Sequence, residues 1–468
     1  MKQEATASTQ KMAKAPVFRL LLTMALPMML SMMIQALYNI VDTIFIGRLE
    51  NRDAATQALG YAYPIQMLLV ALGIGIGIGV NALLSRCLGE KQTEKAARAA
   101  GNGYFLMLVF YAVFLILGIF VLTKGVYFNI CTDNSEVQRL GKNYLGICLI
   151  FSFGQFLQLT AERCLCATGK TGLAMLMQIC GAATNIILDP VFIFGFNLGV
   201  AGAAIATVIG QCVSLAVGLF LNIKCNPELR LAFRHLKPDK EALAEIFKVG
   251  LPAVVLQCLQ SLTTLVFQLV FGILYKGETK DLLVGIYGIY YKLQYFVLML
   301  GYGLTNALIP IISFNYGAKQ PERVKSAVRY ALCIALVIAA VGLLVFECIP
   351  SPLLHAFKAS EFIGEGGFSE FSIGKTIIRT TALSFPFALV NIVFASVFQS
   401  LGSGIRSMIV ALLRLLVVLM PACLLLGALC GVNAIWWGSL IAETVACMYC
   451  IVAYSGMEKR LLTPSPQS

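Results

Sequence analysis

Charged residues are scarce in this sequence. Asp, Glu, Lys and Arg account for 12% of its 468 residues, whereas hydrophobic residues account for 59% and the mean hydropathy is +0.83. A water-soluble protein of this size cannot bury so much apolar surface. The chain also lacks a polar stretch long enough to form a nucleotide-hydrolysing domain. Together these absences exclude a soluble protein and an ATP-driven pump.

Histidine is also nearly missing, since only His235 and His355 are present. A histidine-based metal centre is therefore not expected. The 15 cysteines would suit a disulfide framework, but most of them lie in apolar runs, where cysteine is a small apolar side chain. A net charge of +12 suits nucleic acid or the orientation of a membrane protein, and the apolar composition favours orientation, with no nucleic-acid partner.

Apolar runs of about 20 residues or more recur along the whole chain, which indicates membrane-spanning helices. The period-two alternation of a barrel is not evident. The sequence predicts an all-α integral membrane protein with twelve transmembrane helices, at 17–46, 56–88, 98–124, 138–166, 171–194, 200–223, 244–275, 283–314, 325–349, 374–400, 406–430 and 433–455.

Lys and Arg are more numerous in the connections on the side of the termini, which predicts that both termini are cytoplasmic. We therefore expect a multi-pass protein of the inner (cytoplasmic) membrane, in contact with its lipids. Residues 1–16 form a cytoplasmic N-terminal segment, 224–243 a basic inter-lobe loop, and 456–468 a cytoplasmic tail.

The sequence contains a weak internal repeat. Short matches recur in order at offsets that drift from 225 to 233: Leu26-Pro27 with Leu251-Pro252, Gly89 with Gly317, Gly169 with Gly402, and Gly199 with Gly431. Each repeat has six spans, so both enter the membrane from the same side. This predicts two pseudo-symmetric six-helix lobes, 17–223 and 244–455, with the substrate path between them.

Polar residues interrupt the first span on one helix face. Gln35, Tyr38, Asn39 and Asp42 lie at helical spacings of three, four and seven. A carboxylate at the centre of a membrane helix costs about 2.5–3.5 kcal/mol or more, so such a residue normally faces protein or a water-filled cavity.

The best partners for Asp42 lie in spans 5 and 6. Asn185 and Asp189 share a helix face, and Asp189 and Thr207 lie at similar distances from the intervening turn, so we expect them at one depth. Carboxylate, amide and hydroxyl oxygens suit a hard cation such as Na⁺, and a proton would equally relieve the repulsion between two carboxylates. Simpler readings stay open: Asp189 precedes a helix-breaking proline, and Asp42 pairs with Arg48.

At these residues the sequence resembles the multidrug and toxic compound extrusion (MATE) transporters, from about Leu20 to Tyr454. The matching features are Leu26-Pro27, the face from Tyr38 to Asp42, Arg86-X-X-Gly89, Ala167-Thr-Gly169 and the series Asn185, Asp189-Pro190 and Thr207. The resemblance implies that Asp42, Asn185, Asp189 and Thr207 bind Na⁺ or H⁺, with Tyr38 adjoining.

One departure from the family is informative. A second branch places a Glu in span 7 and an Asp in span 10, where this chain has Gln260 and Asn391. The resemblance therefore favours coupling through the N-terminal lobe. Residues expected at the substrate cavity, with interhelical hydrogen bonding as the open alternative, are Gln35, Asn39, Gln257, Gln260 and Asn391.

The resemblance implies a secondary active multidrug efflux transporter without enzymatic activity or cofactor. It would exchange drugs or toxic organic cations for Na⁺ or H⁺ by alternating access, as a monomer. A flippase for a lipid-linked precursor is the alternative, although only Lys292 and Arg414 offer positive charge for it. An intramembrane lipid-modifying enzyme ranks lower, because both histidines fall in loops.

Overall fold

The structure is a computed structural model that describes residues 7–49, 51–229, 236–356 and 370–462. Throughout these ranges the chain is helical and contains no strand. The side chain of Asn39 and all of His235, both singled out above, lie outside the described part of the chain.

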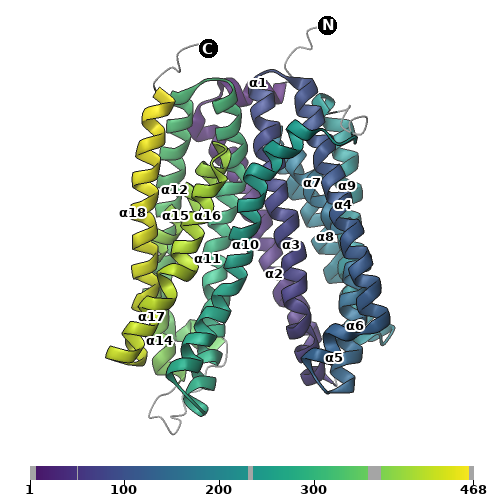
Figure 1. Cartoon of the computed structure of the whole chain (residues 1–468), viewed down its shortest axis with the longest axis vertical. Helices are drawn as coiled ribbons and strands as arrows, with labels where there is room; N and C mark the ends of the chain where they lie inside the picture. The colour runs from purple at the N-terminus through teal and green to yellow at the C-terminus, as the bar shows by residue number, and fades with distance from the viewer. Residues whose placement is uncertain (1–6, 50, 230–235, 357–369, 463–468) are drawn as a thin grey trace.

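The first half of the chain supplies one bundle of helices (Figure 1). In order they are α1 (Ala7–Lys14), α2 (Val17–Ile46), α3 (Arg52–Gly89), α4 (Thr93–Lys124), α5 (Val126–Cys131), α6 (Ser135–Ile150), α7 (Phe153–Ala167), α8 (Thr171–Pro190), the π-helical turn η1 (Val191–Gly195), α9 (Gly199–Cys225) and the 3₁₀ turn η2 (Pro227–Leu229).

The second half forms the other bundle. It contains α10 (Lys240–Leu274), α11 (Glu278–Gly317), α12 (Pro321–Cys348), α13 (Pro350–Ala356), α14 (Glu370–Ala382), α15 (Phe385–Ser400), α16 (Gly404–Leu412), the π-helical turn η4 (Leu413–Val417), α17 (Leu419–Cys430), the 3₁₀ turn η5 (Val432–Ala434) and α18 (Trp437–Leu462).

Ten of the described helices are long and apolar enough to cross a membrane, and the number is twelve if each of two bent pairs forms one span. The bends are 44° between α6 and α7 and 49° between α14 and α15. Both fall in the fourth span of their half, so the two halves repeat this feature. The predicted all-α, twelve-span fold with two six-helix lobes is confirmed.

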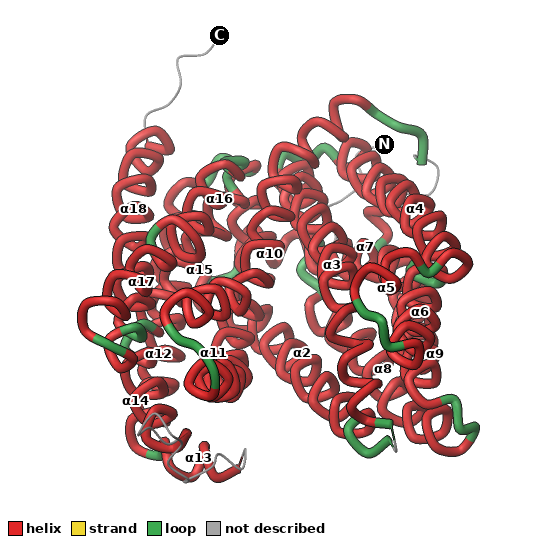
Figure 2. The backbone as a smooth tube through the Cα atoms, turned by 60° about the horizontal axis from the view of Figure 1, so that its bottom comes forward, coloured by secondary structure: helices red, strands yellow, loops and turns green. Residues whose placement is uncertain are grey.

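The two halves lie together near the chain termini and diverge toward the opposite end (Figure 1). Helices α2 and α3 of the first half pack against α10 and α11 of the second. Figure 2 shows these four helices at the centre, with the remaining helices of each half outside them. Any residue on their facing surfaces therefore lies between the halves.

A run of alternate glycines allows this close packing. In a helix, residues two apart point in nearly opposite directions, so the run contributes to two faces of α3. Gly73 and Gly77 face α7 within the same half, whereas Gly75 and Gly79 face α10 across the interface. A Cβ atom on Gly79 would lie 2.4 Å from the carbonyl oxygen of Ile246, so only glycine fits this approach of the two backbones.

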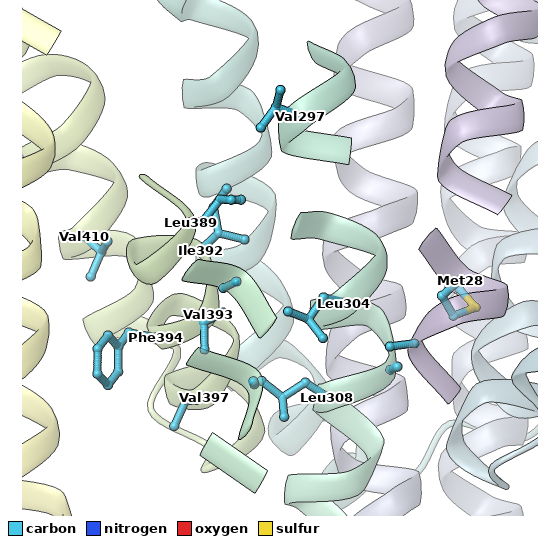
Figure 3. Packing of buried hydrophobic residues seen from close by; sticks show 14 of the residues in the cluster. Met28, Val297, Leu304, Leu308, Leu389, Ile392, Val393, Phe394, Val397 and Val410 are labelled. Atoms are coloured by element: carbon cyan, nitrogen blue, oxygen red, sulfur yellow. The ribbon is translucent and has the colours of Figure 1, made fainter. Parts of the chain in front are cut away.

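Apolar packing continues from one half into the other. Leu304 and Leu308 of α11 belong to the same buried cluster as Val393 and Val397 of α15, and Met28 of α2 reaches that cluster from the first half (Figure 3). All five side chains are essentially excluded from contact with solvent. Because these α11 side chains are buried with those of α15, α11 packs as part of the second half while it also contacts the first.

Candidate functional site

Asn185, Asp189 and Thr207 come together as the sequence predicts. Helices α8 and α9 pack side by side, and the amide nitrogen of Asn185 donates to Asp189 Oδ1 and to Thr207 Oγ1, both at 3.3 Å. Asp189 is fully buried and Asn185 is 4% exposed. Helix α8 continues through Pro190 into η1, so Asp189 lies within helical structure and does not terminate it.

Asp42 approaches this group from α2, which packs against α8. Its carboxylate is close enough to that of Asp189 for the two to interact electrostatically. The alternative partner, Arg48, forms no ion pair with Asp42 in the part of the chain that the structure describes. The four residues implied as a cation site therefore converge from three helices.

Three oxygen atoms in this group are buried without a hydrogen-bond partner among the described residues. They are Asp42 Oδ1, Asn185 Oδ1 and Asp189 Oδ2. All three are acceptors, and a buried acceptor without a donor costs about 1–3 kcal/mol or more. A group with several unpaired acceptors and two carboxylates can accept a positive charge, either a metal cation or a proton.

Polar neighbours surround the two carboxylates. Tyr38 hydrogen-bonds with Gln35 and interacts electrostatically with both Asp42 and Asp189. Tyr144 of α6 also lies within electrostatic range of Asp42.

The sequence argument missed the contribution of α6. Gln66 of α3 donates to the Tyr144 hydroxyl at 3.2 Å and to Cys148 Sγ at 3.5 Å. Polar residues in two further apolar spans were the available signal, but their convergence depends on how α3 and α6 pack.

The second half holds a carboxylate of a different kind. Glu443 of α18 forms a bidentate ion pair with Arg414 of η4, with distances of 2.7–3.0 Å, and both side chains are nearly buried. Asn391 of α15 is fully buried and donates to Glu443 Oε2 at 2.7 Å. This carboxylate therefore already has a permanent cation.

Of the other residues expected at the substrate cavity, Gln35 lies on α2 and the two glutamines of the second half lie on α10. Gln257 and Gln260 are both partly buried. Gln260 hydrogen-bonds with Tyr302 of α11, which interacts electrostatically with Arg414 and Glu443. Their assignment to a substrate cavity stays a prediction.

The fold and the intramembrane polar group are those of a helical membrane transporter built from two repeats. A family model described as MatE matches residues 27–191 and 252–425, one stretch in each half. The chain belongs to the MatE family, whose members are transporters and not enzymes.

Relatives of similar length include the multidrug export protein MepA of Staphylococcus aureus, 26% identical over 453 residues and covering 96% of each chain. MepA of Staphylococcus haemolyticus is 27% identical over 459 residues, covering 96% of this chain and 95% of that protein.

Solved structures share the fold. A multidrug resistance MATE family transporter in an outward-facing conformation matches with a TM-score of 0.90 at 22% identity, covering 98% of this chain and 99% of its own. A MOP superfamily transporter from Pyrococcus furiosus also matches with a TM-score of 0.90 at 22% identity, covering 99% of this chain and 100% of its own.

Proposed function

We propose that this protein is a secondary active multidrug efflux transporter that exports organic, often cationic compounds in exchange for Na⁺ or H⁺. Family membership and relatives named as multidrug export proteins support the export of drugs. The unpaired acceptor oxygens of Asp42, Asn185 and Asp189 support ion coupling in the N-terminal lobe, and this observation carries the proposal.

The coupling ion binds where those oxygens meet. Asp42 and Asp189 supply carboxylate oxygens, while Asn185 and Thr207 supply neutral ones and Tyr38 adjoins them. A bound cation or proton offsets the repulsion between the two carboxylates, so occupancy of the site changes which conformation is stable. We expect occupancy to weaken drug binding and to favour the return of the transporter to its inward-open form.

The arrangement of the halves gives the direction of exchange. Two bodies, 17–223 and 244–455, are joined by the loop 224–243 and rock against each other. With both termini in the cytoplasm, the end where the halves diverge faces outward. An inward-moving positive charge gains about 2.3 kcal/mol per 100 mV of membrane potential, which drives the exchange. The transporter works as a monomer in the inner membrane of the cell.

Replacing Asp42 with Asn tests this proposal. We expect Asp42→Asn and Asp189→Asn to abolish gradient-driven efflux of a fluorescent organic cation while expression is unchanged. Asp53→Asn is the matched control, because Asp53 is an exposed carboxylate at the start of α3 whose nearest ion-pair partner is Arg52 at 3.5 Å. This control should retain efflux.

The same assay identifies the coupling ion. Efflux is measured from cells in which the Na⁺ and H⁺ gradients are collapsed separately, and loss with one gradient alone names the ion. Wild-type efflux in the Asp42→Asn variant would refute N-lobe coupling. A wild-type protein that exports none of the tested dyes under either gradient would instead support a flippase for a lipid-linked precursor.

A further inference from the structure

Two buried residues of opposite charge lie next to each other on α7, close to the contact between the halves. Glu162 and Arg163 are 1% and 2% exposed. The side chain of Arg163 passes Gly77 of α3, where an added Cβ atom would lie 3.3 Å from Arg163 Cγ. Its Nη1 atom donates to Asn306 Oδ1 of α11 at 2.9 Å. Arg163 therefore extends from the first half to make a hydrogen bond with the second.

This hydrogen bond belongs to the end of the molecule where the halves lie together (Figure 1). Asn306 is one turn of α11 away from Gly303, and a Cβ atom on Gly303 would lie 2.4 Å from the Cα atom of Met29 in the first half. Separation of the halves at this end would therefore break the contact between Arg163 and Asn306.

The charge of Arg163 is poorly compensated at this position. Among the described residues its one hydrogen bond is the contact with Asn306, and its Nε atom is buried without a partner. Glu162 Oε1 lies 3.9 Å from Arg163 Nη2, beyond hydrogen-bonding distance, and has no partner in the described part of the chain. The other carboxylate oxygen of Glu162 accepts from Gln178 of α8 at 2.9 Å. A buried ion pair offsets its loss of hydration only when its geometry is good and its remaining polar atoms are satisfied, and this pair meets neither condition.

The ion pair of the second half is better compensated. Arg414 and Glu443 share three hydrogen bonds of 2.7–3.0 Å, and Asn391 donates to the same carboxylate. All three residues lie in the second half, so movement of one half against the other leaves this group intact. Arg163 differs in both respects, because its charge is incompletely paired and its hydrogen bond joins the two halves.

We propose that the buried charge of Arg163 opposes closure of the transporter at the end near the termini, and that Asn306 partly compensates this charge when that end is closed. The inference rests on the proposed rocking of the halves and not on the ion site. When the halves separate at this end, α11 moves away from Arg163, and water hydrates a guanidinium that is always charged. The burial of Arg163 thus keeps the two conformations close in free energy, so that ion or substrate binding can shift the balance.

Removing the hydrogen bond should favour the open end. Spin labels on Lys95 of α4 and Glu322 of α12, exposed positions in different halves, give the ratio of long to short distances. Full-length protein is measured in lipid nanodiscs, in the ionic condition that gives wild type the most even mixture. Asn306→Leu leaves the guanidinium buried without its partner and should raise this ratio about 10- to 150-fold.

Removing the charges should have the opposite effect. Combining Glu162→Gln with Arg163→Met replaces the pair by neutral side chains of similar length. The ratio should fall at least about fivefold, because the closed end then buries neither charge. In this neutral background Asn306→Leu should change the ratio by less than about twofold, since no guanidinium remains to lose its partner.

Two variants serve as controls. Asn222→Leu removes hydrogen bonds to the carbonyl oxygens of Ala161 and Gly218, which lie in the same half, so it should lower stability without changing the ratio. Arg139→Met removes an exposed arginine of α6 and should also leave the ratio unchanged. Thermal unfolding of every variant separates a change in conformation from a loss of folding.

Three results would overturn the proposal. An unchanged ratio in Asn306→Leu would show that this hydrogen bond does not affect the conformation. A large effect of Asn306→Leu in the neutral background would show that Asn306 acts independently of Arg163. A higher ratio in the neutral double variant would show that the charges hold the end closed. Failure of the ion site is distinguishable from all three, since it appears in the gradient-driven efflux of Asp42→Asn, whereas the distances are measured without a gradient.

Discussion

Replacing Gly79 with Ala should shift the transporter away from the conformation described here. The added Cβ would lie 2.4 Å from the carbonyl oxygen of Ile246 and 3.1 Å from the amide nitrogen of Gly250. These are backbone atoms of a helix in the other half, so they cannot move aside as a flexible side chain would. Helices α3 and α10 would have to separate by about 1 Å to restore ordinary contact.

The magnitude follows from the cost of overpacking. Inserting a methyl group into a well-packed interface costs about 1–3 kcal/mol. The contact exists only while the halves lie together at the end near the termini, so the cost falls on this conformation alone. The ratio between this conformation and one open at that end should therefore change by about 5- to 150-fold.

Gly73→Ala provides a matched control in the same helix. Its Cβ would lie 2.6 Å from Leu159 Cδ1, a side-chain atom of α7 in the same half. This overlap lies within one half, so it is present in both conformations, and the end of the Leu159 side chain can move to relieve it. Gly73→Ala should therefore leave the balance between conformations unchanged.

Distances between spin labels measure this balance. Labels on Lys95 of α4 and Glu322 of α12, introduced through an unnatural amino acid because the chain has 15 cysteines, report on one exposed position in each half. The long-distance population should grow in Gly79→Ala and not in Gly73→Ala. Identical distance distributions in the two variants would refute the assignment of Gly79 to a conformation-specific interface.

Two further predictions concern buried or interfacial arginines. Arg414→Gln leaves the Glu443 carboxylate without its cation and should destabilise the protein by about 3–5 kcal/mol in thermal unfolding. Adding Glu443→Gln should recover most of that loss of stability. No recovery in the double variant would show that the broken ion pair is not the cause. Arg323 of α12 donates to two backbone carbonyls of the N-terminal segment at 2.8 and 3.0 Å. Arg323→Met should therefore speed tryptic cleavage within α1. Arg329→Met, at an exposed position of α12, should not change the rate of cleavage.

Most of the fold was predictable because a membrane allows so few kinds of backbone structure to cross it. Only helices satisfy their own backbone groups across a bilayer, so apolar length alone predicts the spans. The bends within the fourth span of each half were not predicted. At Ser152 no proline follows and Gly154, two residues on, is a weak signal, whereas at Ser384 the signal was stronger, since Pro386 suits the start of a new helix.

In the candidate site, too, some contacts were predictable from the sequence and others were not. The grouping of Asn185, Asp189 and Thr207 depends only on helical period and on a hairpin of two adjacent spans, so the sequence predicts it. Contacts between the halves depend on how non-adjacent helices are placed. Arg163 donates to Asn306 across the interface at 2.9 Å, and no spacing in the sequence pairs these two residues.

The two halves repeat in fold but differ in how their carboxylates are compensated. An arginine is always charged in a protein, so Glu443 keeps its partner in every state of the transporter. Asp42 and Asp189 have no such partner among the described residues. In the exchange proposed above, an ion gradient acts directly on the first half alone. The second half must respond through what the halves share, which is the interface lined by Gly75 and Gly79 near the termini.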